Sequence, residues 1–256
     1  MAKQQKQSPY RNKPNPKVSV VIPVFNEKKT LGQVLREAYR VHRDMEVIVV
    51  ANGSTDGTRE LAERSGAKVI SFRETLGHDV GRSIGAGEAR GEIVLFLDGD
   101  MVIAAAELIP FIRAVEQGVD VALNRHSGVT DRKDVHQVVA AKHALNAMIG
   151  RLDLAGASLT AVPHALSRRA LDVIGTEHLS VPPKAQMIAA IRGLRIEAVH
   201  HINVRKLNPV RRRSRFKDPV GDLIVGDHLE AIRWLTENRD LRGGKPDLGR
   251  KREIVR

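Results

Sequence analysis

Two carboxylates separated by one glycine, Asp98-Gly99-Asp100, directly follow the apolar run Ile93–Leu97. Glycine permits a tight turn, so both carboxylates are expected to emerge together from the end of a buried strand. Magnesium takes oxygen ligands and is usually held by one or two carboxylates plus substrate phosphates. The pair therefore predicts a binding site for a metal diphosphate, although an isolated Asp-Gly turn more often only caps the next helix.

Two further polar loops follow apolar runs. In the first, Asn52-Gly53-Ser54-Thr55-Asp56-Gly57, small and amide-bearing residues can approach a base or a ribose edge. Thr55 or Asp56 can equally serve as a helix cap. In the second, Glu27 follows Pro23-Val-Phe-Asn26 and can accept hydrogen bonds from ribose hydroxyls, or can simply begin a helix.

From Lys17 onward, short β-branched runs alternate with helix-like stretches, which is typical of a mostly parallel sheet covered by helices. In such sheets, ligands bind beyond the carboxyl ends of the strands, where all three loops are expected. The expected strands are Val18–Val24, Glu46–Ala51, Lys68–Phe72, Ile93–Leu97, Val119–Leu123 and Arg195–His200. The expected helices are Thr30–His42, Thr58–Ser65, Val80–Arg90, Ala105–Glu116, Asp131–Ile149, Ser167–Val173, Pro183–Arg192 and Pro219–Asn238.

The chain of 256 residues is 42% hydrophobic and can bury one sizeable core, so we expect a single α/β domain over residues 17–239. Its first half, residues 17–125, carries the three loops. Residues 1–16 and 240–256 are rich in Pro and basic residues and are expected to be flexible tails. The chain has no cysteine, no signal-peptide pattern and no membrane-length apolar run, so we expect a cytoplasmic protein.

The formal charge of +12 suggests an anionic partner, but the charge is unevenly distributed. Residues 1–17 carry five Lys or Arg and no acid, and residues 205–217 carry seven and none. The basic residues are thus concentrated in the tails and one loop, while the rest of the chain is close to neutral. This distribution argues against a nucleic-acid partner and favours contact with an anionic substrate or the anionic inner face of a membrane.

The ordered loops resemble those of the family 2 glycosyltransferases, which have the GT-A fold. The likeness covers about residues 17–125, and four motifs at this spacing are specific where any one alone is weak. The resembling residues are Val18 through Glu27, Val47 through Thr58, Gly77 through Gly91 with Gly81, Arg82 and Gly85, and Val94 through Asp100.

The resemblance implies a nucleotide-diphospho-sugar donor and a Mg²⁺ or Mn²⁺ ion. It assigns ribose and metal contacts to Asp98 and metal binding to Asp100. It places Arg82 on a helix that faces the donor site, although the sequence fits a solvent-exposed arginine at least as well. The implied contacts to the base and ribose are Pro23, Glu27, Asn52 and Ser54. Ala51-Asn52 stands where the family commonly has Asp-Asp, which leaves the choice of nucleotide open.

The second half, residues 126–239, is expected to bind the acceptor, and there the resemblance thins. Glu177 is a candidate catalytic base or a surface glutamate, and a phosphate acceptor would need no base because it is already ionised. His201 of the pair His200-His201 is a candidate metal ligand or a strand-end histidine. The cations Arg205, Arg211, Arg212 and Arg213 are candidates for a lid over the diphosphate, for a lipid contact, or for a solvated charge run.

Three hypotheses follow from these residues. The first is a metal-dependent glycosyltransferase that acts on an anionic or lipid-linked acceptor. The second is a sugar-phosphate nucleotidyltransferase, which would need a glycine-rich basic loop where this chain has Pro23 through Glu27. The third is a non-catalytic protein that keeps the GT-A fold and uses its cationic segments to bind an anionic partner.

Overall fold

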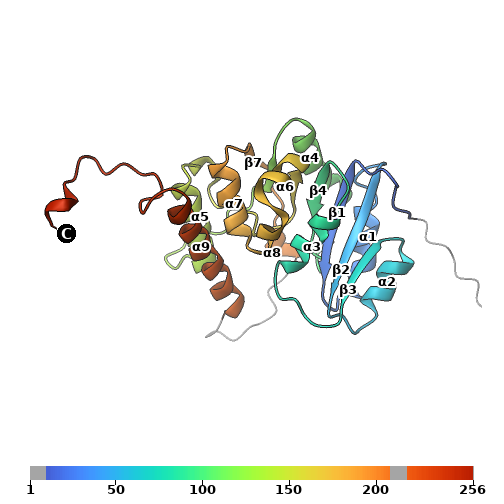
Figure 1. Ribbon diagram of the computed structural model, residues 1–256. Coiled ribbons are helices and arrows are strands. Elements are labelled where there is room, and N and C mark those ends of the chain that lie inside the picture. Colours follow the sequence, from blue (N-terminus) through green and yellow to red (C-terminus); the bar gives the residue numbers. More distant parts are fainter. Residues whose placement is uncertain (1–9, 208–217, 256) are drawn as a thin grey trace, which may run out of the picture.

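A seven-stranded sheet runs through the fold (Figure 1) in the computed structural model, which describes residues 10–207 and 218–255. The strand order is β3-β2-β1-β4-β6-β5-β7, and β6 is the one antiparallel strand among those described. The expected α/β fold with a mostly parallel sheet is confirmed. The strands are β1 (Val18–Val24), β2 (Met45–Asn52), β3 (Lys68–Phe72), β4 (Ile93–Phe96), β5 (Val121–Asn124), β6 (His164–Ser167) and β7 (Ile196–His200).

Strand β6 was missed by the sequence analysis, which placed only a helix from Ser167 onward. The sequence His164-Ala-Leu-Ser167 contains no β-branched residue, so nothing in it signals a strand. The strand exists because it fills the gap between β4 and β5, where Leu95 and Ala122 both pair with Ala165. Because β6 is antiparallel to both neighbours, β5 runs parallel to β4, and the carboxyl ends of β1, β4 and β5 lie at one edge.

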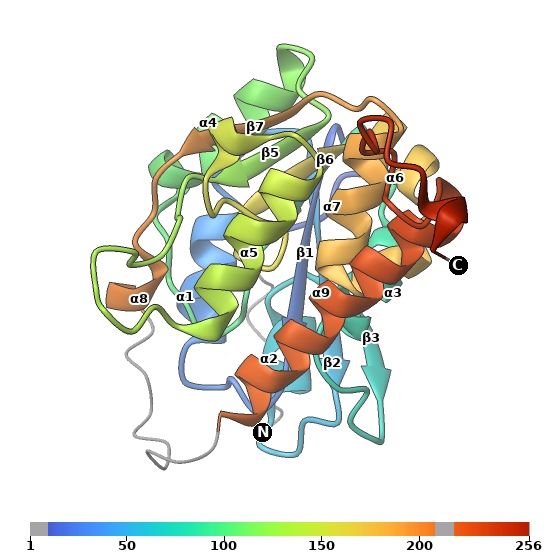
Figure 2. The same ribbon diagram turned by 90° about the vertical axis from the view of Figure 1, so that its left-hand side faces the viewer.

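Helices cover both faces of the sheet (Figures 1 and 2). Helices α1, α2 and α4 pack on one face, and α3, α6 and α7 pack on the other. Outside α7, helices α5 and α9 form a further layer around Leu145, Met187, Ala231 and Leu235. The helices are α1 (Leu31–Ala38), α2 (Thr58–Arg64), α3 (Val80–Glu88), α4 (Ala105–Glu116), α5 (Gln137–Met148), α6 (Arg168–Ile174), α7 (Pro182–Ile191), α8 (Val204–Leu207) and α9 (Pro219–Asn238).

Two helices are shorter than expected. Helix α1 ends at Ala38, four residues before the expected end, and the next ring, Tyr39, stacks on Tyr10 with centroids 4.9 Å apart. Helix α5 begins at Gln137 because the imidazole of His136 accepts a hydrogen bond from the Val138 amide and caps the helix there.

Helix α3 lies unusually close to the sheet because glycines face it. A Cβ atom on Gly85 would lie 2.3 Å from a methyl group of Val21 on β1. This close approach brings the first turn of α3 against the carboxyl ends of β1 and β2.

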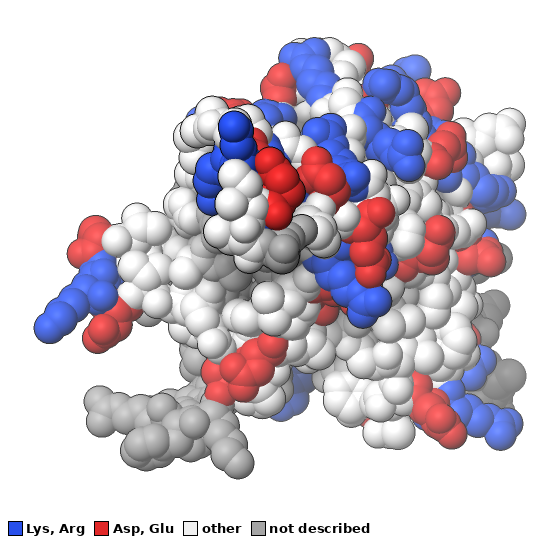
Figure 3. All heavy atoms as spheres, turned by 60° about the vertical axis from the view of Figure 1, so that its left-hand side comes forward, with Lys and Arg blue, Asp and Glu red and all other residues white. Residues whose placement is uncertain are grey.

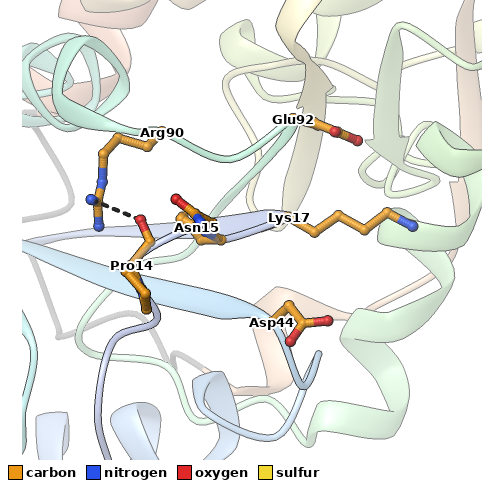
Figure 4. A pocket seen from close by; sticks show the side chains of 7 residues that line it. Pro14, Asn15, Lys17, Asp44, Arg90 and Glu92 are labelled. Carbon is orange, nitrogen blue, oxygen red and sulfur yellow. Dashed lines mark hydrogen bonds between the residues drawn. The ribbon is translucent and has the colours of Figure 1, made fainter.

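Residues 10–16, which the sequence analysis assigned to a flexible tail, lie against the sheet. The Asn12 side chain exchanges hydrogen bonds with the main chain of Val47. Arg90 binds the buried carboxylate of Glu46 at 2.8 Å and donates to the Pro14 carbonyl at 3.1 Å (Figure 4). The hollow in Figure 4 lies at the amino ends of β1 and β4, and its cations Arg90 and Lys17 already have protein partners. We therefore assign it a structural role.

At the other end of the chain, residues after α9 lead away from the body of the molecule (Figure 1). Asp247 holds this segment together through ion pairs with Arg242, Arg250 and Arg252.

Candidate functional site

A cleft of about 250 Å³ lies beyond the carboxyl ends of β1, β2 and β4. Five residues that the sequence analysis proposed for the donor site line it together with Asp100. The lining residues are Pro23, Val24, Phe25, Glu27, Asn52, Gly77, His78, Asp79, Arg82, Asp98, Gly99 and Asp100. The chain thus brings together, at the sheet edge, residues that are up to 77 positions apart in sequence.

The Asp98-Gly99-Asp100 turn is packed against the end of β1. A Cβ atom on Gly99 would lie 2.5 Å from a Val24 methyl group, so only glycine fits between the two carboxylates. The Thr30 hydroxyl lies 2.8 Å from the Gly99 carbonyl and 3.2 Å from the Glu27 carboxylate. Thr30 therefore links the Asp98-Gly99-Asp100 turn, the candidate metal site, to Glu27 and to the start of α1.

A buried arginine lies between two carboxylates of the cleft. Arg82 on α3 is 8% exposed, and its guanidinium lies 2.7 Å from Asp79 and 3.2 Å from Asp98. Burial pushes the pKa of Arg82 down, but the Asp79 and Asp98 carboxylates outweigh it and raise that pKa. Burial raises the pKa of Asp79, Arg82 opposes this, and Asp98 adds to it. Asp79, Arg82 and Asp98 thus form a fixed charged triad in which Arg82 stays a cation.

Asn52 lines the cleft, but its amide is already engaged. Its Nδ2 donates to the Gly77 carbonyl at 3.1 Å, and its Oδ1 accepts from the Leu76 amide. Asn52 therefore holds the loop of residues 73–79 over the cleft, and a base edge would have to compete with these main-chain groups.

Ser54 is not among the lining residues. Its hydroxyl accepts from the Asn26 amide at 3.1 Å, while the Asn26 side chain accepts from the Thr55 amide at 2.8 Å. These bonds join the loop after β1 to the loop after β2, so Ser54 fixes the shape of the site from outside it.

The composition of the cleft fits a divalent cation. Four carboxylates, those of Glu27, Asp79, Asp98 and Asp100, and one guanidinium line it. A diphosphate entering this negative cleft would be repelled unless a cation accompanied it. Oxygen ligands from one or two carboxylates plus substrate phosphates are the donor set that Mg²⁺ and Mn²⁺ accept. Asp98 and Asp100 therefore fit the expected metal.

Outside the Asp98-Gly99-Asp100 turn, the sequence analysis did not propose five residues of the cleft as site residues: Val24, Phe25, Gly77, His78 and Asp79. Asp79 had one available signal, because it stands three positions before Arg82 at the start of a helix. Gly77 and His78 belong to a loop whose path depends on its bonds to Asn52, and no local pattern reveals such bonds.

The acceptor-side candidates do not join this cleft. The Glu177 side chain is 72% exposed and is absent from the cleft lining. The ring of His201 lies against that of His126, tilted by 37° with centroids 5.9 Å apart, and His200 contacts Glu107 at 2.8 Å. No group of three or more His, Asp or Glu side chains in the described residues is arranged to hold a metal, so His201 does not complete such a site here.

Of the basic candidates, Arg205 lies in α8, whereas Arg211, Arg212 and Arg213 lie outside the described residues. The proposed role of all four arginines in a lid over the diphosphate stays a prediction.

One acid that the sequence analysis did not select faces this region from α9. Burial raises the pKa of Asp227 to about 6, and the carboxylates of Asp79 and Glu230 add to the shift.

Comparisons with known proteins agree with this geometry. Residues 19–169 match the family model described as Glycosyl transferase family 2. The chain is 30% identical over 144 residues to the undecaprenyl-phosphate 4-deoxy-4-formamido-L-arabinose transferase of Edwardsiella ictaluri, covering 52% of this chain and 43% of that protein. It is 32% identical over 115 residues to the cholesterol galactosyltransferase of Borreliella burgdorferi, covering 43% of this chain and 32% of that protein. The matches span less than half the length of these relatives.

Among solved structures, the chain resembles glucosyl-3-phosphoglycerate synthase from Mycobacterium tuberculosis in complex with Mn²⁺, UDP and glucosyl-3-phosphoglycerate. The TM-score is 0.59 and the identity 23%, over 91% of this chain and 82% of that one. This likeness supports the fold.

Proposed function

The chain belongs to glycosyl transferase family 2, and from this membership we propose that it transfers a sugar from a nucleotide-diphospho-sugar to a phosphate-bearing acceptor. The observation that carries the proposal is the cleft itself, in which Pro23, Glu27, Arg82, Asp98 and Asp100 converge at one edge of the sheet. Such an edge is where α/β sheets bind nucleotides.

We assign the donor diphosphate, together with Mg²⁺ or Mn²⁺, to Asp98 and Asp100. The metal would neutralise charge on the diphosphate leaving group. Support comes from the excess of carboxylates in the cleft and from the Mn²⁺ and UDP described for the Mycobacterium tuberculosis synthase. Arg82 fixes the orientation of Asp98, and Glu27 accepts from the ribose hydroxyls. Asn52 and Ser54 act by holding the loops.

A phosphate-bearing acceptor is the chemical class shared by two of the similar proteins. One is named for undecaprenyl phosphate, and the other was described in complex with phosphoglyceric acid. Where the phosphate itself accepts the sugar, as with undecaprenyl phosphate, it is largely ionised near neutral pH and attacks without a general base. This agrees with a cleft to which Glu177 does not contribute.

The position of the protein in the cell is part of the proposal. No helix among the described residues is long and apolar enough to cross a membrane. If the acceptor is lipid-linked, the basic segments would contact the anionic inner face of the membrane from the cytoplasm. On the face shown in Figure 3, basic and acidic side chains are interspersed, and such a surface offers nucleic acid no continuous basic track.

The other two hypotheses, a sugar-phosphate nucleotidyltransferase and a non-catalytic binding protein, find no support among the similar proteins. Pyrophosphate release from a nucleoside triphosphate and a sugar phosphate would favour the first. Tight lipid or RNA binding without nucleotide affinity would favour the second.

The proposal is tested by calorimetry with UDP and GDP, in the presence and absence of Mn²⁺. We expect one nucleotide to bind below about 1 mM with the metal, and a phosphate acceptor plus the matching nucleotide-sugar to yield the glycosylated product. The control is Glu60→Gln, at an exposed position on α2. The proposal is wrong if neither nucleotide binds the wild-type protein with metal.

A further inference from the structure

Among the described residues of the acceptor half, one lysine is buried without an acidic partner in that part of the structure. Lys142 on α5 is 6% exposed, and its Nζ makes one hydrogen bond among the described residues, a long one of 3.4 Å to the His126 carbonyl. No carboxylate in this part of the chain pairs with it, and burial alone lowers the pKa of Lys142 to about 8. A buried ammonium without a counter-charge is costly, so its presence calls for a physical explanation.

A second buried polar atom lies nearby on α9. His228 is 3% exposed, and its Nδ1 donates to the Ile224 carbonyl at 2.6 Å. Its Nε2 has no hydrogen-bond partner among the described residues. Helices α5 and α9 are in contact, because Gln137 donates to Asp222 at 2.9 Å and because Leu145 and Ala231 belong to one apolar cluster. Burial lowers the pKa of His228, and the charge of Lys142 lowers it further. Figure 2 shows these two helices side by side.

The Lys142 ammonium lies at the same edge of the sheet as the donor cleft. Lys142 contacts His126, which follows the end of β5, and β5 is parallel to β4 and β1. His201, after β7, lies against His126. A ligand held by Lys142 would therefore lie beside the donor site along the strand ends.

We propose that Lys142 Nζ and His228 Nε2 bind the phosphate group of the acceptor. An incoming phosphate would replace the long bond from Lys142 to the His126 carbonyl with a charge-assisted one. In its monoanionic form, which keeps one hydroxyl, the phosphate would donate that hydrogen to His228 Nε2, the acceptor nitrogen of a ring whose Nδ1 donates to Ile224. The anion would also supply the missing counter-charge. This inference rests on the proposed function for the choice of ligand, while the buried, unpaired cation stands independently of it.

The alternative is that Lys142 only holds the loop after β5 in place through its hydrogen bond to the His126 carbonyl. That reading predicts a loss of stability on substitution but no effect specific to phosphate.

Calorimetry with the full chain separates these readings. The probes are inorganic phosphate, phosphoglyceric acid as a soluble phosphomonoester, and decyl phosphate micelles as a lipid phosphate, each added with UDP and Mn²⁺ present. Lys142→Met is expected to weaken phosphate binding by about tenfold or more. The matched control is Lys184→Met, because Lys184 on α7 is already paired with Glu230 at 2.9 Å and should not affect phosphate binding.

A Lys142-dependent preference for decyl phosphate would identify a lipid acceptor, and one for phosphoglyceric acid a soluble acceptor. Either result supports the site. Wild-type protein that does not bind any probe, or Lys142→Met with unchanged affinity, would overturn it. If Lys142→Met does not fold, His228→Gln serves instead, with about a threefold loss expected and unchanged affinity as the contrary result. Binding of UDP with Mn²⁺ is measured in the same samples, so failure of the donor site is seen separately.

Discussion

Residues 17–125 and residues 126–239 place their polar groups in different ways. In the first half, the cleft is built by loops that directly follow β1, β2 and β4, and its carboxylates are close to their strands in sequence. In the second half, four of the buried polar side chains, Lys142, Asn146, Gln186 and His228, project from helices and are covered only after α5, α7 and α9 have packed. Functional residues in loops that follow strands can therefore be predicted from the sequence. Functional residues that come together between packed helices cannot.

Among the substitutions that test this difference between the halves, Arg82→Met is expected to cause the largest loss of stability. The substitution leaves Asp79 and Asp98 facing each other without a cation, and losing one partner of a buried ion pair costs about 3–5 kcal/mol of unfolding free energy. Chemical denaturation and UDP calorimetry should both show a loss. The double variant Arg82→Met with Asp79→Asn should recover part of the stability, and failure to recover any would argue against the triad.

A smaller effect is expected from Gln186→Met in the second half. Gln186 is fully buried, accepts from the Leu159 amide at 2.9 Å and donates to Asn146 at 2.7 Å. Leaving these groups without a partner should cost about 1–3 kcal/mol. UDP affinity with Mn²⁺ should stay unchanged, because the network does not reach the donor cleft. A parallel loss of UDP affinity would mean that the two halves are coupled.

The unfolding free energy is expected to depend on pH through a histidine where the two halves of the sheet meet. His164 on β6 is 2% exposed, and burial, followed by the charge of Arg82, lowers its pKa from 6.5 to about 3. Between these values the unfolded chain binds a proton that the folded chain does not, so the unfolding free energy falls as pH falls. The contribution is at most about 1.4 kcal/mol per pH unit.

The comparison variant is His164→Asn, whose amide can still donate to the Ala161 carbonyl that His164 Nδ1 contacts at 3.0 Å. Urea denaturation between about pH 6 and pH 4 should show a steeper loss for the wild-type protein. Equal slopes would mean that His164 is not held neutral.

The features that could be predicted from the sequence also differ between the two halves of the chain. The order of strands and helices in the first half and the Asp98-Gly99-Asp100 turn could be predicted from local patterns. The position of Arg82 on a helix facing the cleft followed only from the resemblance to a known family. Strand β6 could not, since His164–Ser167 has no strand propensity and is held by its neighbours. Lys142 and His228 could not, because a lysine or histidine on a helix gives no sign of burial until another helix covers it.

The most direct test of the account is electron paramagnetic resonance of Mn²⁺ titrated with the protein in the presence of UDP or GDP. The account predicts that the nucleotide and the protein together bind Mn²⁺ more tightly than either alone. It also predicts that Asp100→Asn weakens this binding by about tenfold or more, while Glu60→Gln has no effect. Mn²⁺ binding that is independent of nucleotide, or unchanged in Asp100→Asn, would contradict the assignment of the cleft as a metal-dependent donor site.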